Sequence, residues 1–133
     1  MGPTVNMQRT PIGGRNFECF SEDPLLTASL ATAYIRGIQR DPVNPNDAHA
    51  AACVKHFVCN DVEFGRMWAS SEVSERALRE IYLPPFLCAV KHGHVCAIMG
   101  MVSVVCEPKW DLLLRTYRQT DRQTDRIHLK ISN

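Results

Sequence analysis

Three short apolar runs, separated by two stretches with helical periodicity, constrain the fold of this chain most strongly. The runs are PTVNM (3–7), AACVKHF (51–57) and VCAIMGMVSVV (95–105). Short apolar runs of this kind suit strands that are buried on both faces, as in a parallel sheet. The order strand, helix, strand, helix, strand predicts an α/β fold in which right-handed crossovers join parallel strands.

Both intervening stretches carry helix start signals. Asp23–Pro24 combines an N-cap residue with a proline at the first helical position, and apolar residues recur at helical spacing over 25–39. Ser74 is suited to cap a second helix over 75–91. Within that helix, Pro84–Pro85 predicts a kink or an interruption.

Length and charge narrow the functional classes. The chain has 133 residues, enough for one domain, with a net charge of +1. There is no basic excess to indicate nucleic-acid binding, and no apolar run approaches the roughly 20 residues that cross a bilayer. The first residues also lack the pattern of a secretory signal. We therefore expect neither a nucleic-acid nor a membrane partner, and the sequence assigns no compartment.

The six cysteines form no C-x-x-C pair, which argues against a zinc ribbon or a thioredoxin-type site. Four of them lie in or beside apolar segments, namely Cys53, Cys59, Cys88 and Cys96. Buried thiols are favoured over disulfides there, although an even number of cysteines permits bridges.

His92 and His94 allow two interpretations. They are either two metal ligands or residues at the end of the second helix, with Gly93 as its cap. The sequence offers no third ligand, so the helix end is favoured. Gly13–Gly14 is an isolated pair rather than a phosphate-binding loop. We expect no metal and no cofactor.

Three polar residues are candidates for a binding site. Lys55 and His56 stand near the end of the second apolar run, and Arg15 lies in the loop after the first. In parallel α/β folds the loops after the strands share one rim, where ligands bind. Such donors suit a hydroxyl-rich or anionic ligand. The alternative is an ion-pair network with acidic neighbours, namely Glu18, Asp61 or Glu63.

Three segments also carry a family resemblance. GPTVNMQRTPIGGRNFECFSEDPLL (2–26), VKHFVCNDVEFGRM (54–67) and VSERALREIYLPPF (73–86) occur in this order. Together they resemble the N-terminal domain of glycoside hydrolase family 3, in its β-glucosidase branch, over about residues 2–99. The resemblance implies a (β/α)8 barrel or a near relative of one. It also implies a hydrolase that removes β-linked glucose or related sugars with retention of configuration.

The resemblance assigns roles to the candidate residues. It implies that Arg15, Lys55 and His56 bind hydroxyls of the sugar in the subsite where the bond is cut. Three further residues of the second segment follow the family more loosely, and we expect them to support the site from behind: Asp61, Glu63 and Arg66. Trp68 is a candidate either for stacking on a sugar or for packing on the barrel rim.

The chain departs from the family at the reacting groups. The family's nucleophile is an aspartate in a Ser-Asp-Trp motif, and this motif does not occur here. Asp111, in KWDLL, has different neighbours and stands too early in the chain. The family's acid/base comes from a second domain. We therefore expect no catalytic residue in these 133 residues.

The length gives the same expectation, because a (β/α)8 barrel takes about 250 residues. We predict a barrel fragment with about three parallel strands and two to three helices, over residues 1–115. Residues 116–133 include RQTDRQTDR and are predicted to be a divergent, solvated low-complexity tail. Open barrel edges expose unpaired backbone, so self-association is expected.

Three functions compete at this stage. The first is a β-glucosidase-type hydrolase of which this chain is a part, with a β-glucoside or oligosaccharide as substrate. The second is a non-catalytic remnant that binds sugar weakly or not at all. The third is an unrelated α/β binding module, which the three ordered segments disfavour. Members of the family are often secreted, lysosomal or vacuolar.

Overall fold

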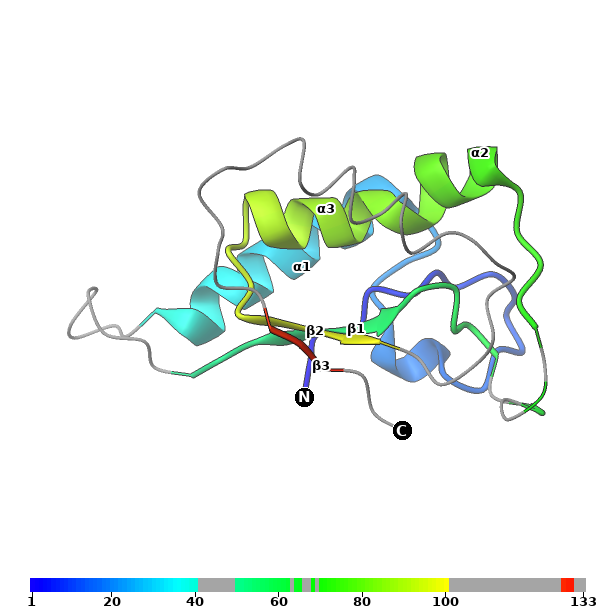
Figure 1. Ribbon diagram of the computed structural model, residues 1–133, viewed down its shortest axis with the longest axis horizontal. Helices are drawn as coiled ribbons and strands as arrows, with labels where there is room; N and C mark the ends of the chain where they lie inside the picture. Colours follow the sequence, from blue (N-terminus) through cyan, green and yellow to red (C-terminus); the bar gives the residue numbers. More distant parts are fainter. Residues whose placement is uncertain (41–49, 63, 66–67, 69, 101–127, 131–133) are drawn as a thin grey trace.

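The computed structural model describes residues 1–40, 50–62, 64–65, 68, 70–100 and 128–130. Its centre is a parallel sheet in the order β1-β2-β3, with the helices on one side of it (Figure 1). The strands are β1 (Cys53–Phe57), β2 (Ala97–Gly100) and β3 (His128–Lys130). The predicted α/β class with parallel strands is confirmed.

The first predicted strand is an extended segment that pairs with β1 without forming a full strand. Thr4 makes isolated parallel bridges to Lys55 on one side and to Cys19 on the other. The Val5 amide donates to the Lys55 carbonyl at 2.8 Å, and the Lys55 amide donates to the Pro3 carbonyl at 3.0 Å. The segment over 3–7 therefore continues the sheet beyond β1.

β1 is regular only in its first half. Cys53 and Val54 pair in register with β2, and the register shifts before Phe57. The Lys55–His56 and Phe57–Val58 peptide bonds are cis. The predicted Lys-His pair thus stands where β1 leaves the regular ladder.

The helix α1 (Pro24–Gln39) begins where the sequence predicts. The carboxylate of Asp23 accepts from the Leu25 amide at 2.8 Å, which satisfies one of the open donors of the first turn. Its inner face carries Ala31 and Ile35, which are fully buried. This face packs against the second helical segment.

The second helical segment has three parts: α2 (Glu75–Ala77), a π-helical turn η2 (Leu78–Tyr82) and α3 (Leu83–Lys91). Ser74 caps its start, as predicted, by accepting from the Ala77 amide at 3.2 Å. The interruption expected at Pro84–Pro85 lies one turn earlier. Each proline ring crowds the carbonyl four residues before it, and a wider π turn makes room for that carbonyl.

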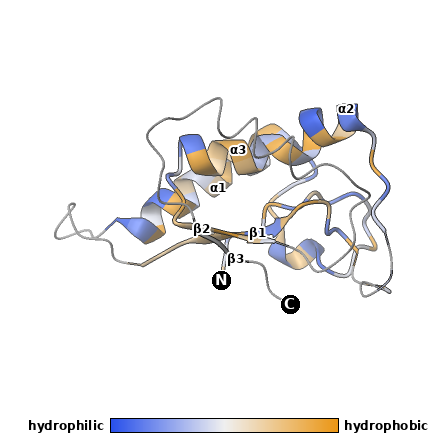
Figure 2. Ribbon diagram, in the orientation of Figure 1, coloured by the Kyte–Doolittle hydropathy of each residue, from blue (hydrophilic) through white to orange (hydrophobic). Residues whose placement is uncertain are grey.

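The core lies between the sheet and the helices. Figure 2 shows hydrophobic residues along α3 and along the sheet that it covers, where α3 contacts β1. Its buried members are Val5, Met7, Ala31, Ile35, Ala52, Val54, Phe57, Val58, Cys59, Leu78, Tyr82, Phe86, Ala89, Val90, Val95 and Ile98. Val58 and Cys59, which follow β1, belong to this core, so the core holds the start of the loop after β1 in place.

Gln39, the last residue of α1, ties the helix to the amino ends of the strands. Its side-chain oxygen accepts from the Ala52 amide at 3.3 Å and from the Cys96 amide at 3.0 Å. Its nitrogen donates to the His94 carbonyl at 2.9 Å. One neutral side chain therefore bridges the segments that lead into β1 and β2.

β3 lies inside 116–133, where the polar repeat predicted only a solvated tail; the repeat itself and Asp111 lie outside the described residues. Of the four cysteines expected to be buried, Cys59 is buried, Cys53 and Cys88 are half-buried, and Cys96, on the bend before β2, is exposed. In the described part of the chain, no helix has the length and hydropathy to cross a membrane.

Candidate functional site

The candidate residues meet at the carboxyl end of β1. The loop after the first extended segment and the loop after β1 lie side by side at one end of the sheet, drawn in blue and green in Figure 1. Arg15 precedes the short 3₁₀ turn η1 (Asn16–Glu18) in the first loop, and Lys55 and His56 belong to β1. The prediction that these three residues share one rim is confirmed in its geometry.

Glu18 is the carboxylate on which this cluster converges. One of its oxygens, Oε2, accepts from Lys55 Nζ at 3.1 Å and from Thr4 Oγ1 at 3.1 Å. The other oxygen, Oε1, pairs with Arg15 Nε. The side chains of Arg15, Glu18 and Lys55 are 23%, 16% and 19% exposed, so the ion pairs are largely shielded from water. The ion-pair network that the sequence offered as an alternative is present.

His56 is held from two sides. Arg15 Nη2 lies 2.9 Å from His56 Nε2, and Asn6 Oδ1 lies 3.1 Å from His56 Nδ1. A guanidinium can only donate, so Nε2 accepts and the ring proton is on Nδ1, where it is donated to Asn6. Asn6 also accepts from the His56 amide at 2.9 Å and donates to its carbonyl at 3.3 Å. The buried amide of Asn6 thereby fixes both the backbone and the tautomer of His56.

The electrostatics of Glu18 follow from these contacts. Burial by itself would raise the pKa of Glu18, but hydrogen bonds from Arg15, Lys55 and Thr4 outweigh it. They lower the pKa from 4.5 to about 2. Glu18 is therefore ionised at neutral pH, and it remains the counter-ion of the two cations.

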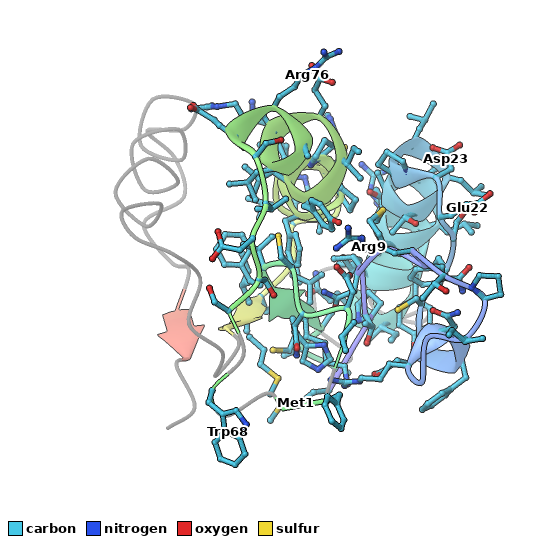
Figure 3. The ribbon with its side chains drawn as sticks, turned by 90° about the vertical axis from the view of Figure 1, so that its right-hand side faces the viewer. Met1, Arg9, Glu22, Asp23, Trp68 and Arg76 are labelled. Carbon is cyan, nitrogen blue, oxygen red and sulfur yellow. The ribbon has the colours of Figure 1, made fainter. Side chains whose placement is uncertain are left out.

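Asp61 lies behind the cluster rather than within it. Its Oδ1 accepts from the Met7 amide at 3.1 Å, and its Oδ2 is 4.0 Å from Arg9 Nη1. Burial raises the pKa of Asp61, and the Met7 amide, the Arg9 charge and a hydrogen bond with Asn6 offset part of the rise. Figure 3 shows Arg9 between the two loops and the helices, where its guanidinium lies 5.6 Å from the Tyr82 ring centre. Asp61 thus reaches the cluster through Asn6.

Two residues of the site were absent from the sequence-based prediction, namely Thr4 and Asn6. Both lie in an apolar run that was interpreted as a strand, and nothing in its pattern distinguishes these polar members. Glu18 was present only as an ion-pair alternative; its spacing of three residues from Arg15 within one turn is the signal that marks it.

Other candidates contribute less. Glu63 and Arg66 lie outside the described residues, so their supporting role stays a prediction. Trp68 is 84% exposed and stands at the margin of the molecule in Figure 3. Among the residues that the structure describes, no three His, Cys, Asp or Glu side chains gather as metal ligands. Of the cysteines in that same part, Cys19, Cys53, Cys88 and Cys96 are free thiols.

Comparison with known proteins supports the family resemblance of this chain. The model of the glycosyl hydrolase family 3 N-terminal domain matches residues 1–113. A β-glucosidase of Rhizobium radiobacter is 54% identical over 100 residues, which cover 75% of this chain and 11% of that protein. A β-glucosidase of Kluyveromyces marxianus is 54% identical over 105 residues, covering 79% of this chain and 12% of its own. The chain thus spans about a tenth of the length of these relatives.

Solved structures agree on the fold. The β-glucosidase 3B of Thermotoga neapolitana in complex with glucose superposes with a TM-score of 0.81 at 34% identity. The match covers 99% of this chain and 18% of that enzyme. The Kluyveromyces marxianus β-glucosidase in complex with glucose gives a TM-score of 0.69 at 51% identity, over 79% of this chain and 12% of its own. The predicted fold, a fragment of a (β/α)8 barrel, is confirmed.

Proposed function

Since this chain belongs to the family of the glycosyl hydrolase family 3 N-terminal domain, we propose that it is the sugar-binding part of a retaining β-glucosidase-type O-glycosyl hydrolase. The observation that carries the proposal is the convergence of Arg15, Lys55 and His56 at the carboxyl end of β1. The β-glucosidase relatives support a β-glucoside or an oligosaccharide as the substrate class.

The three side chains suit a sugar because they offer donors and an acceptor in a small space. Lys55 carries three N–H donors; among the described residues Glu18 accepts from one of them, and the others can reach hydroxyl oxygens of a sugar. His56 Nε2 is an acceptor that a sugar hydroxyl can share or take over from Arg15. Hydrogen bonds of this kind that strengthen at an oxocarbenium-like transition state lower the barrier to bond cleavage. Losing one charged donor should cost roughly 1.5–3 kcal/mol of binding.

The reacting carboxyl groups are proposed to lie outside these 133 residues. A retaining glycosidase needs a nucleophile and an acid/base about 5–5.5 Å apart. Glu18 suits neither role, because its pKa of about 2 leaves no proton to give at neutral pH and three donors occupy its oxygens. Asp61 is held behind the cluster by Met7 and Arg9. We expect these 133 residues alone not to hydrolyse an aryl β-glucoside.

Because neither Glu18 nor Asp61 is placed to react, a second candidate is a non-catalytic remnant that binds sugar weakly or not at all. The intact mass of the endogenous protein separates the two. A mass near 15.0 kDa favours the remnant, and a much larger mass favours the hydrolase with its nucleophile elsewhere in the chain.

Sugar binding itself is tested by thermal unfolding at increasing glucose. A ligand that binds only the folded state raises the stability by RT ln(1 + [L]/Kd). We expect glucose to raise the unfolding temperature of the wild type and of Lys91→Ala, a charge loss at the end of α3. Lys55→Ala should lose the response. No shift in the wild type at high glucose contradicts sugar binding.

Self-association is a further part of the proposal. The described sheet is open, with β3 at one edge, whereas strands of a closed barrel have partners on both sides. A second copy can pair with such an edge. Sedimentation velocity over a range of concentrations tests this, and a monomer at every concentration contradicts it.

A further inference from the structure

We propose that Glu18 is a positioning residue which, as the shared counter-ion of Arg15 and Lys55, makes the site prefer neutral sugars to anionic ones. This inference rests on the proposed sugar-binding function, and it adds a residue and a specificity to it. Glu18 does not itself touch the sugar; it acts through the two cations that it holds.

The geometry supports a shared counter-ion. Arg15 and Lys55 come from separate segments, the 3₁₀ loop and β1, and meet on opposite oxygens of one carboxylate. Two cations that share so small a space repel each other, and a charge of opposite sign between them offsets this repulsion. The Thr4 hydroxyl, at 3.1 Å, occupies a further acceptor position on Oε2 and fixes how the carboxylate is turned. The cations are thereby aligned before any ligand arrives.

The charge balance gives the specificity. With Glu18 ionised, the trio of Arg15, Glu18 and Lys55 carries a net charge of +1 and its strongest donors are already partly neutralised. A neutral hexose then binds well in comparison with a hexuronate, because its binding depends on hydrogen bonds rather than on charge. Without the carboxylate the trio carries +2, which attracts a hexuronate more than a neutral sugar.

Glu18→Gln tests the proposal, because it keeps the size of the side chain and removes its charge. An amide also turns an NH₂ group toward at least one of the donors from which the carboxylate accepted a hydrogen bond, and two donors cannot bond to each other. We expect glucose affinity to fall about tenfold or more, which corresponds to the loss of one charge-assisted hydrogen bond. We also expect the ratio of glucuronate affinity to glucose affinity to rise. Glu22→Gln is the matched control: it removes the same charge four residues away, at the outer margin of the molecule in Figure 3.

A second variant separates charge from shape. Glu18→Asp shortens the side chain by one methylene and keeps the charge, so it should bind glucose more weakly but keep the wild-type preference for glucose over glucuronate. A Glu18→Asp chain whose preference matches that of Glu18→Gln overturns the role of the charge. An unchanged preference in Glu18→Gln overturns it as well.

The positioning role has a test that needs no sugar. The ¹⁵N side-chain signals of Lys55 and Arg15 should shift in Glu18→Gln and stay unchanged in Glu22→Gln. If the wild type binds neither sugar, the proposed function and the specificity fail together, and these signals still decide the positioning role. Signals that do not move in Glu18→Gln overturn it.

Discussion

The acid sensitivity of the fold should depend on Glu18. The carboxylate has a pKa of about 2 in the folded chain and an ordinary value of 4.5. At 1.36 kcal/mol per pKa unit, this difference corresponds to about 3 kcal/mol of stability when the group is ionised in both states. The side chain is 16% exposed, so solvent screening removes only a modest part of this energy.

The sign of the effect follows from the lowered pKa. Below pH 4.5 the unfolded chain takes up a proton at Glu18 and the folded chain does not, so stability is lost as the pH falls toward 2. The contribution should be about 3 kcal/mol at pH 7 and roughly 1.4 kcal/mol at pH 3. Burial raises the pKa of Asp61, which acts in the opposite direction: its protonation favours the folded chain as the pH falls toward the ordinary value of 3.8. A comparison of variants that all retain Asp61 removes this second effect.

The assay is urea unfolding followed by far-ultraviolet circular dichroism, at pH 7 and at pH 3. Glu18→Gln should be less stable than the wild type at pH 7, and the difference between the two should shrink at pH 3. Glu22→Gln should match the wild type at both. A difference for Glu18→Gln that stays the same at the two pH values refutes the linkage, because it would then come from shape rather than from charge.

Three further outcomes can be checked on the same chain. Gln39→Ala leaves three backbone groups without their side-chain partner and should lower the free energy of unfolding by about 2–3 kcal/mol in urea titrations. Gly93→Ala should destabilise, because a Cβ there would lie 2.6 Å from a backbone carbonyl of α3, whereas Gly37→Ala meets nothing within 4 Å and should stabilise by about 0.4–1 kcal/mol. Burial raises the pKa of Cys19 to about 11, so mass mapping after brief alkylation at pH 8 should find Cys96 labelled before Cys19.

Much of the fold was predictable because its signals are local. Asp23 and Ser74 cap the helices that the sequence assigned to them, since a capping side chain needs only a neighbouring amide. The run at 51–57 became a buried strand beside β2, as its apolar composition indicates. The rim that joins Arg15 to His56 was also predictable, because parallel strands place their carboxyl ends at one edge.

The rest depends on contacts between distant segments. Asn6 and His56 are 50 residues apart, and no local pattern marks an asparagine that will hold a histidine. The strand β3 follows a polar repeat, and nothing in the pattern of that repeat predicts that β3 pairs with β2. The two prolines at 84–85 were evident in the sequence, but the sequence does not tell whether the helix is distorted before or after them. In the structure the distortion is the π turn over 78–82, which lies before them.

The two ends of β1 are fastened by different chemistry, and this makes stability and binding separable. At the carboxyl end, charged groups meet on Glu18, and the energy of such contacts depends on pH and, less strongly for shielded pairs, on salt. At the amino end, the neutral amide of Gln39 holds backbone groups, and its energy depends on neither. Variants at Gln39 should therefore lower stability equally at all pH values and leave the sugar preference unchanged. Variants at Glu18 should alter stability, pH dependence and sugar preference together, because one carboxylate both fastens the loop to the strand and pairs with the two cations that we propose bind the sugar.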